Sequence, residues 1–413
     1  MRILHTSDWH LGKNLEGHSR LKEQEMFLDE LALMVEEEGV DLLIIAGDIY
    51  DTANPPALAE KLFYDTIGRI ADFGERCVLV IAGNHDNPDR LEAASPLANT
   101  HGVILLGNPK SKVECGSYGN IEILESGEAY IKVRIRGEEA VIVTLPYPSE
   151  KRLNEVFSVG WDEEIRRKDY SERVGQLLAK ASDNFRDDTI NLAVSHLYMV
   201  GGDESGSERP IQLGGSFAIE SSRLPNAQYI ALGHLHRSQT VAGSLKRARY
   251  SGSPLQYSRS EIQNSNCVYI VDILPGQEAQ IEQKFLKNYK PIEVWECQSI
   301  DDAMARCHLN AGRDIWAYLE IKTDREITQQ QMKDMKSLVT DIVQIRPIFA
   351  SADSDKDTEE ADYEDLQMDE LFKAYYKSVY GANIPEELLA LFYKIVEGEE
   401  DEDETQITED KGA

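Results

Sequence analysis

Five short runs of apolar residues mark the first 260 or so residues of the chain, and none of them alternates with polar positions. Unbroken runs of this kind are typical of strands buried on both faces, because half-exposed strands alternate. Between the first two runs, Phe27, Leu31 and Val35 recur at helical spacing, and a second helix is predicted over residues 57–73. The predicted strands span residues 3–4, 42–46, 78–82, 190–194 and 229–232.

The alternation of strand and helix predicts a largely parallel sheet with helices on both faces. Residues 121–145 instead carry short β patterns separated by Gly127 and Gly137, which indicates a second sheet packed on the first. A further strand is predicted over residues 267–273. The expected fold class is therefore α/β, a two-sheet sandwich flanked by helices.

A new alternation begins near residue 289 and predicts a small α+β module. Its strands are expected at residues 292–295, 315–321 and 342–348, and its helices at 300–309 and 328–338. An acidic stretch typical of a disordered linker follows, and then two apolar-rich helices of the kind that dock on another surface. We predict segment boundaries at 1–285, 286–350, 351–365, 366–397 and 398–413.

The formal net charge of the 413-residue chain is −31, and much of the excess lies toward its C-terminus. Residues 353–370 contain ten acidic side chains and residues 397–410 contain nine. This acidity argues against broad electrostatic adhesion to nucleic acid or to anionic membranes. It does not exclude a phosphate-ester substrate, because bound cations reverse the local field at a metal site.

The five cysteines are an odd number and include no C-x-x-C pair, which favours a reducing compartment with free thiols. The first residues lack the apolar core of a signal peptide. No apolar run reaches the roughly 18 residues that a membrane span requires. We therefore expect a soluble, cytoplasmic protein with no membrane association.

Side chains that bind metals follow each of the five apolar runs within a few residues. Because parallel strands end at one edge of a sheet, groups just beyond their C-termini should converge. Imidazole, carboxylate and amide groups suit Mn, Fe or Zn, and the absence of thiolates argues against a closed structural zinc site. The candidate metal ligands are Asp8, His10, Asp48, Asn84, His196, His234 and His236.

Asp48 and His85 are expected to have special roles in this cluster. Two cations about 3.5–4 Å apart need a bridging carboxylate, and Asp48, at the end of the second strand, is the natural candidate. Gly47 and Gly83 precede ligands, which is consistent with sharp backbone turns. His85 adjoins Asn84 and cannot share its direction in an extended loop. Its imidazole is suited to donate to the phosphate or to the leaving oxygen, so we predict a catalytic role.

The ordered motifs D-x-H, G-D-x-x-D, G-N-H-D, a single His after a strand, and G-H-x-H are those of the calcineurin-like metallophosphoesterases. The chain resembles this family over roughly residues 1–260. The longer motifs around Asp8, Ser207 and Ser253 are similar to the SbcD family of nuclease subunits within it. The later segments agree only in layout, and the acidic tail departs from the family pattern. The resemblance implies one metal on Asp8, His10, Asp48 and His236 and another on Asp48, Asn84, His196 and His234.

The resemblance also implies an activity and partners. The activity is a Mn2+-dependent 3′→5′ exonuclease on duplex DNA and an endonuclease on single strands and hairpins, used in DNA end processing, repair and recombination. The partners are a second nuclease subunit, forming a homodimer, and two chains of the ATPase SbcC, forming a heterotetramer. Residues 1–285 would be the nuclease domain, 286–350 a capping domain, and 366–397 the SbcC-docking segment.

Two other functions stay open at this point. One is a metallophosphoesterase for a small phosphate ester, against which the long extension past the catalytic half argues. The other is a non-catalytic scaffold, although such scaffolds usually lose ligands and none is missing here. Asp51 and Asp86 are expected to support the ligand loops, and Trp9 to pack in the core. The candidate DNA contacts are Arg20, Lys22, Arg209, Arg237 and Arg259. The alternative is that these side chains are ordinary solvent-exposed residues with no role in binding.

Overall fold

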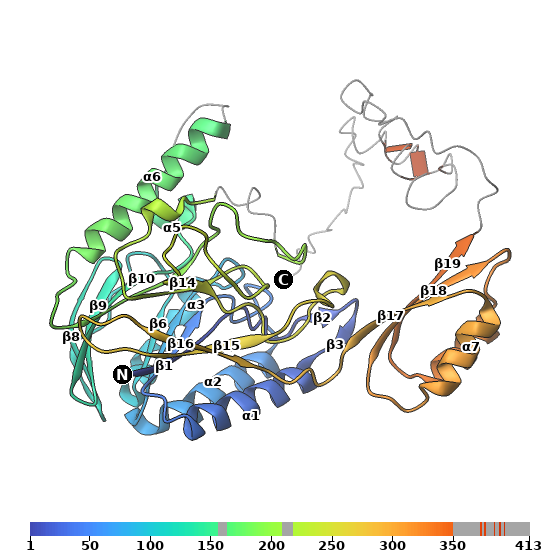
Figure 1. The fold of residues 1–413 in the computed structure, drawn as a ribbon, viewed down its shortest axis with the longest axis horizontal. Coiled ribbons are helices and arrows are strands. Elements are labelled where there is room, and N and C mark those ends of the chain that lie inside the picture. The colour runs from blue at the N-terminus through green and yellow to red at the C-terminus, as the bar shows by residue number, and fades with distance from the viewer. Residues whose placement is uncertain are drawn as a thin grey trace, which may run out of the picture. The chain divides into compact units, whose positions relative to one another are not determined.

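The structure, a computed structural model, divides the chain at residue 349, and the larger unit, Met1–Phe349, is drawn in Figure 1. The described residues are 1–155, 163–208 and 218–349, with Phe372, Lys373, Tyr376, Ile384, Leu388, Leu389 and Phe392. The predicted linker, docking helices and tail therefore lie almost wholly outside the described residues. Among the described helices, none is long and apolar enough to cross a membrane.

The first sheet of the larger unit has six strands and contains three of the five predicted apolar runs. Four adjacent strands are parallel, the next one is antiparallel to them, and the last strand at that edge is antiparallel to its neighbour, so only the fifth strand runs in the opposite direction. In spatial order they are β16 (Gln280–Phe285), β15 (Cys267–Asp272), β1 (Arg2–Thr6), β4 (Leu42–Ala46), β5 (Cys77–Ile81) and β6 (Val103–Leu106). Helices α1 (Leu21–Glu37) and α2 (Ala57–Ala71) cover the outer face, where Phe27 and Phe63 pack against Leu43 and Ile45.

The second sheet has eight strands and contains the other two predicted runs. Thr144 of β10 pairs in parallel with Val194 of β11, which pairs in turn with Ala231 of β12. The spatial order is β13 (Gln239–Thr240), β14 (Ala248–Tyr250), β12 (Tyr229–Gly233), β11 (Ile190–His196), β10 (Glu138–Leu145), β9 (Tyr130–Ile135), β8 (Ile121–Gly127) and β7 (Gly116–Tyr118). The expectation of one common sheet edge for all five runs is therefore wrong, because the runs belong to two sheets.

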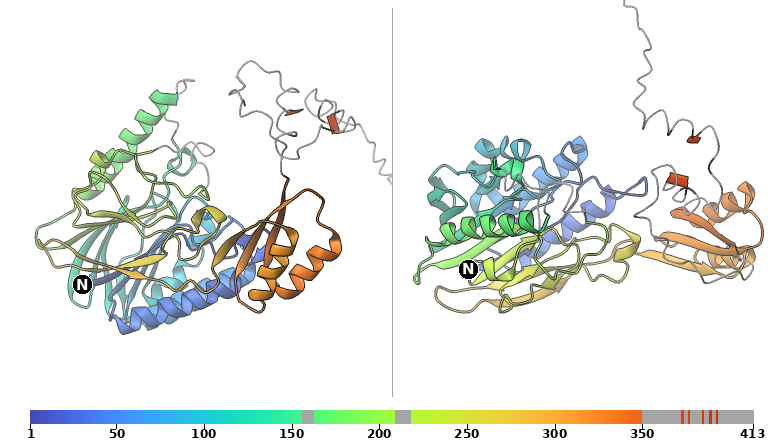
Figure 2. Two further views of the ribbon diagram at one scale, coloured as in Figure 1. Left: turned by 45° about the vertical axis from the view of Figure 1, so that its right-hand side comes forward. Right: turned by 90° about the horizontal axis from the view of Figure 1, so that it is seen from above.

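The two sheets pack face to face, and helices cover both outer faces, as the views in Figure 2 show. The predicted two-sheet sandwich is thus confirmed. Every residue of β4 and β5 is buried, because apolar layers lie on both sides of these strands. On the outer face of the second sheet lies α6 (Glu163–Ser182), which contributes Tyr170, Val174 and Leu177 to the core. Helix α6 was not predicted, because its dense charges leave only a narrow apolar stripe.

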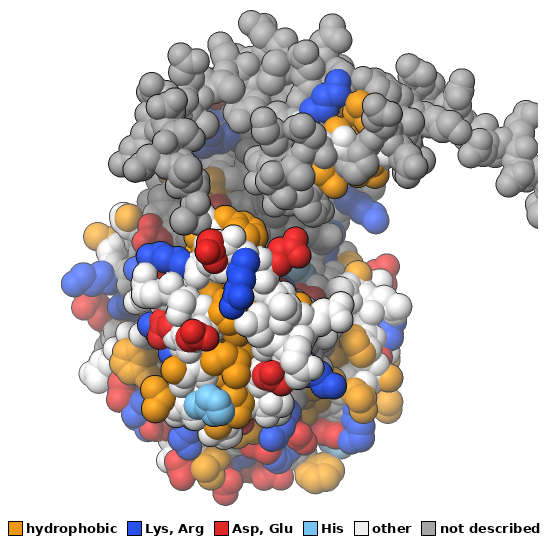
Figure 3. Space-filling model, turned by 90° about the vertical axis from the view of Figure 1, so that its right-hand side faces the viewer, with side chains coloured by type: hydrophobic (Ala, Val, Ile, Leu, Met, Phe, Trp, Pro, Cys, Tyr) orange, Lys and Arg blue, Asp and Glu red, His pale blue; other side chains and the backbone are white. Residues whose placement is uncertain are grey.

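Residues 292–349 form a separate three-stranded parallel sheet with its helices on one face. The five predicted elements are confirmed with bounds shifted by at most two residues, namely β17 (Ile292–Cys297), α7 (Ile300–Leu309), β18 (Trp316–Thr323), α8 (Gln329–Leu338) and β19 (Ile342–Phe349). On the opposite face, Trp316 and Tyr318 pack with Leu15 of the β2–β3 hairpin (Asn14–Leu15 and His18–Ser19). Figure 3 looks onto this end of the larger unit, where hydrophobic side chains lie among charged ones.

Candidate metal centre

Four of the predicted ligands lie at unusual backbone positions. Asp8, His10, Asp48 and His234 have positive φ angles of 54°, 45°, 50° and 109°. Residues other than glycine rarely adopt such angles, and each instance costs on the order of 1–3 kcal/mol. Hydrogen bonds hold the loops in place: Asp8 N–H donates to the Gly47 carbonyl and His10 N–H to that of Asp48, each at 3.0 Å. The fold thus sustains local strain where the candidate ligands gather.

Glycines allow the strand ends to approach one another. A Cβ atom on Gly83 would overlap the Asp48 carboxylate, and one on Gly47 would overlap the His196 imidazole. Gly47 also has a φ of +92°, which a side chain would strain. The glycines are therefore required both for the turn and for the close packing of ligand side chains between the two sheets.

One group of donors consists of Asp8, His10 and His236, whose ligand atoms lie within 4.8 Å of one another. The two imidazoles point their Nε2 atoms at each other, 3.0 Å apart. All three side chains are buried, with exposed fractions of 3% or less. Asp48 lies next to this group, with Oδ2 3.8 Å from His10 Nε2.

A second group gathers around Asp48 and Asn84. Asp48 Oδ2 lies 3.4 Å from His196 Nε2. Asn84 Oδ1 lies 2.9 Å from His196 Nε2 and 3.0 Å from His234 Nδ1. The strand ends of both sheets thus bring all seven candidate ligands into one cluster. Asp48 lies between the two groups, and Asp8 of the first group is also within 4.8 Å of Asp48 and His196.

Two imidazoles of the metal-free cluster are in the form that binds metals, whereas the Asp48 carboxylate raises the pKa of a third, His196, to about 9. Burial lowers the pKa of His234 to about 3 and that of His10 well below its usual value, so both rings are neutral, the form that binds metals. Burial also raises the pKa of Asp8 to about 6. Nitrogen and oxygen donors that face one another in a buried space, without thiolates, suit divalent metals such as Mn, Fe and Zn. The residues present therefore fit a divalent metal.

His85 lies on the accessible side of the cluster. His85 and Asn84 are half-buried, whereas the other candidate residues are buried. The His85 N–H donates to Asp48 Oδ1 at 2.8 Å, and its ring Nδ1 lies 2.6 Å from the Asp51 carbonyl. Because a carbonyl only accepts, Nδ1 carries the proton and Nε2 is left to accept a proton or, when protonated, to donate one.

Known proteins resemble the chain over nearly its full length. Residues 1–238 match the calcineurin-like phosphoesterase family, and residues 288–380 match the type 5 capsule protein repressor C-terminal domain. The D subunit of the SbcCD nuclease of Bacillus subtilis is 41% identical over 409 residues, covering 98% of this chain and all of the relative. The chain belongs to the family of the SbcCD nuclease D subunits.

A solved structure and a second D subunit are also similar to the chain. Among solved structures, a dimetal phosphatase from Danio rerio is 15% identical, with a TM-score of 0.35, over 68% of this chain and 98% of its own. The Escherichia coli K12 member of the D-subunit family is 29% identical over 358 residues and covers 81% of each chain. The relatives in sequence thereby confirm the family resemblance expected from the motifs.

Asp86 acts as expected in this member of the D-subunit family, tying together the loops after β4 and β5. Its carboxylate accepts from the N–H groups of Gly83 at 2.7 Å, Tyr50 at 3.0 Å and Ile49 at 3.2 Å. Trp9 is fully buried and packs edge-on against Phe27, so its predicted packing role is confirmed. Asp51 accepts a hydrogen bond from Lys13 at 2.8 Å and lies beside the cluster.

The proposed DNA contact at Arg20 is wrong. Arg20 is only 1% exposed, because its guanidinium pairs with Glu23 at 2.6 Å and donates to the Gln256 carbonyl at 2.6 Å. Arg259 is partly exposed but pairs with Glu320 at 2.7 Å. Lys22 and Arg237 are exposed, so these candidates stay open, and Arg209 lies outside the described residues.

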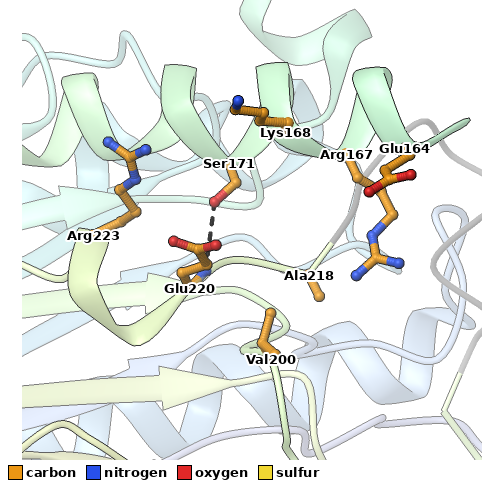
Figure 4. Close-up of a pocket in the computed structure, with 8 residues that line it drawn as sticks. All are labelled: Glu164, Arg167, Lys168, Ser171, Val200, Ala218, Glu220 and Arg223. Atoms are coloured by element: carbon orange, nitrogen blue, oxygen red, sulfur yellow. Dashed lines mark hydrogen bonds between the residues drawn. The ribbon is translucent and has the colours of Figure 1, made fainter. Parts of the chain in front are cut away.

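A cavity of about 580 Å³ lies along α6, and none of its lining residues belongs to the ligand cluster (Figure 4). Arg167, Lys168 and Arg223 line it together with Glu164 and Glu220. The mixture of cations and anions gives it no clear preference for charge. The cluster of seven candidate metal ligands, and not this cavity, is therefore the candidate active site.

Sequence reasoning missed two carboxylates behind His236. Glu261 Oε1 lies 2.8 Å from His236 Nδ1, and Glu208 Oε1 accepts from the His236 backbone N–H at 3.0 Å. Glu208 belongs to the Ser207 motif that carried the resemblance, but Glu261 lies in a short 3-10 turn, Arg259–Glu261, that follows no predicted strand. A single acid in such a turn gives no sequence signal of its own.

Proposed function

We propose that this chain is the DNA-cleaving subunit of a nuclease complex and hydrolyses phosphodiester bonds at the metal cluster. The observation that carries the proposal is the gathering of all seven candidate donors in one cluster of a chain that belongs to the SbcCD D-subunit family. The retention of every donor argues against a non-catalytic scaffold.

The proposed roles follow the donor groups. Asp8, His10 and His236 would hold one cation, Asn84, His196 and His234 the other, and Asp48 would bridge them. Bound divalent cations, for which we propose Mn2+, supply Lewis acidity and a water of lowered pKa. Burial keeps His10 and His234 neutral, so that their lone pairs are available as ligands.

We propose that His85 acts on the substrate. Its backbone N–H and Nδ1 are both held by neighbouring oxygens, so the ring is fixed with Nε2 available. From the half-buried side of the cluster this atom can donate to a phosphate oxygen or to the leaving oxygen. His85 is then the residue that separates metal binding from cleavage.

The family membership supports a proposal for the substrate range and the assembly. We propose 3′→5′ exonuclease activity on duplex DNA and endonuclease activity on single strands and hairpins, in the cytoplasm. The relatives' name, SbcCD, denotes a complex, so we propose the ATPase SbcC as partner, with two copies of each subunit and contact between the two nuclease subunits. Residues 286–350 would cap the nuclease domain, and residues 366–397 would dock on SbcC, with 398–413 as a tail.

The test of function uses the full chain with Mn2+ and end-labelled duplex DNA. We expect the wild type to degrade DNA ends, and His85→Ala to bind Mn2+ with unchanged affinity but to lose cleavage by about 10²–10⁴-fold, the contribution of a general acid or base. His308→Ala, at an exposed position on α7, is the matched control and should behave as wild type. Fast turnover of small phosphodiesters with no action on any DNA would overturn the nuclease function.

The test of partner binding removes residues 366–396 from the chain. We expect this deletion to abolish complex formation with SbcC, measured by co-purification, and to spare the basal Mn2+-dependent cleavage. A stable complex between SbcC and the shortened chain would show that the docking segment lies elsewhere.

A further inference from the structure

The four imidazoles of the cluster differ in what lies behind their metal-facing atoms. His196 has a backbone carbonyl behind it, with Nδ1 2.9 Å from the Ala46 oxygen. His10 Nδ1 has no hydrogen-bond partner among the described residues. His234 turns Nδ1 itself toward Asn84. His236, in contrast, has the carboxylate of Glu261 2.8 Å from its Nδ1.

The Glu261 contact determines the tautomer of His236, because the Ser207 hydroxyl, 2.7 Å from the same Nδ1, donates its own proton to Glu261 and can only accept from the ring. An ionised carboxylate can only accept a hydrogen bond, so the Nδ1 atom that faces it must carry a proton. The opposite tautomer would place a nitrogen lone pair against a carboxylate oxygen at 2.8 Å, which is repulsive. With the proton on Nδ1, the lone pair of a neutral ring lies on Nε2, and this is the atom that faces His10 and the first donor group.

Glu261 is itself held from several sides. Its Oε2 accepts the Tyr257 backbone N–H at 2.7 Å, and its Oε1 accepts from the hydroxyl of Ser207. Ser205 Oγ lies 2.9 Å from Glu208 Oε1 and 3.3 Å from Glu261 Oε1. The Glu261 side chain is fully buried, so its geometry is set by these contacts and not by solvent.

A buried acid and a half-buried acid behind one metal ligand are hard to explain by stability alone. Glu208 and Glu261 both contact Ser205 and His236, and burying carboxylates near one another is costly unless positive charge compensates for it. Asp8 adds a third acid, within reach of the same imidazole. A cation at the first donor group would compensate for these charges.

We propose that Glu261 is a positioning residue that fixes His236 with its Nε2 lone pair toward the first donor group and so strengthens cation binding there. Ser207, from the motif around residue 207, assists by holding the carboxylate. The carboxylate increases the basicity of the imidazole through the Nδ1 hydrogen bond, as buried acids do behind other metal-binding histidines. The inference rests on the proposed metal site. It makes the two cation positions unequal, with the Asp8, His10 and His236 group dependent on Glu261.

The test is a Mn2+ titration of the full, metal-free chain, by calorimetry and by the electron paramagnetic resonance signal of free Mn2+. Glu261→Gln keeps the shape and removes the charge, whereas Glu261→Asp keeps the charge and withdraws it from Nδ1. We expect both variants to weaken the binding of one of the two Mn2+ ions by about 10–100-fold and to leave the other unchanged. Glu278→Gln, an exposed acid on the turn after β15, is the charge-matched control and should bind as wild type.

Ser207→Ala keeps the inference testable if the Glu261 variants fail to fold, which circular dichroism of the metal-free chain will show. It should weaken the same ion by a smaller factor. Wild-type isotherms in the folded Glu261 variants, or an equal loss in Glu278→Gln, would overturn the inference while leaving the nuclease proposal intact. Conversely, a wild-type chain that binds two ions but cleaves no DNA would overturn the proposed function and not the role of Glu261.

Discussion

The ligand end of the sandwich and the three-stranded module of residues 292–349 are both built from parallel strands, yet their interiors differ. At the ligand end, Asp8, Asp48 and His196 are buried with exposed fractions of 2% or less, and candidate ligands have positive φ angles. Across the module, all of which is described, only Gly312 has a positive φ, and the core is apolar. One region has backbone strain and buried charge where the candidate ligands gather, and the other has an apolar core without them.

The two regions meet at a junction outside the cluster of candidate ligands. The module contacts the sandwich through a polar and aromatic junction, where the Trp316 indole N–H donates to Glu23 at 3.0 Å and the Tyr318 hydroxyl to Glu16 at 2.8 Å. Arg20 lies between, 5.7 Å from the Trp316 ring. Chemistry and stability should therefore respond separately to substitution in the two regions.

The largest expected effect is the loss of activity in Asp48→Asn. Asp48 Oδ2 lies 3.8 Å from His10 Nε2 and 3.4 Å from His196 Nε2, so it faces both donor groups. The amide should therefore lower Mn2+-dependent cleavage by about 10³-fold, the upper range for one stabilising group. The thermal midpoint of the metal-free chain should fall as well, because the substitution removes one partner of the buried Asp48–His196 pair, whose atoms lie 3.4 Å apart. The control is Asp301→Asn, at an exposed position on α7. Retained cleavage in Asp48→Asn would contradict the bridging role.

The opposite effect is expected for Leu319→Ala in the module. Leu319 is 1% exposed in the core between β18 and the helices, so its truncation should cost about 2–5 kcal/mol of the stability of the module. Denaturant unfolding, followed by amide exchange in residues 316–323, measures this cost. Mn2+ affinity at 25 °C should stay at the wild-type value. If the variant also lost metal binding, the two regions would be one cooperative structure and the comparison would fail.

Metal should stabilise only one of the two regions. Mn2+ at about 100 times its dissociation constant should add about 2.7 kcal/mol to the stability of whatever part of the fold holds the site. We expect slower amide exchange at residues 6–10, 46–50 and 82–86 on adding Mn2+, and unchanged exchange at residues 316–323. A chelator should reverse the protection. Equal protection of both regions would show that metal binding stabilises the module together with the ligand end, and would contradict the comparison.

The same contrast explains what could be predicted from the sequence. Asp8, Asp48 and His196 were identifiable because metal-binding residue types follow apolar runs, which is a local signal. The sheet to which β11 and β12 belong could not be predicted. The pairing of Thr144 with Val194 is a contact between distant segments, and periodicity does not encode such contacts.

Errors and omissions among single residues have the same cause. Arg20 was predicted to be accessible, but it is buried by Gln256 and Trp316, more than 200 residues away in sequence. Glu261 acts on His236 from a turn 25 residues further along the chain. The helices and strands of the module were predicted well, because local pattern and capping residues determine them.

The smallest expected effect tests that local origin. Ser299 Oγ accepts the Asp302 backbone N–H at 3.1 Å and caps the first turn of α7. Ser299→Ala leaves that N–H without its side-chain partner and should cost about 1 kcal/mol of the stability of the module. Ser337→Ala is the matched control, because Ser337 lies within α8, donates only to the Asp334 carbonyl and caps nothing, so alanine should be neutral or slightly stabilising there. Denaturant unfolding of the module in the full chain measures the midpoints of the two variants and distinguishes them. Equal midpoints for both variants would show that the stability of α7 comes from packing on β18 and not from its cap, and Mn2+ binding should be the same in both.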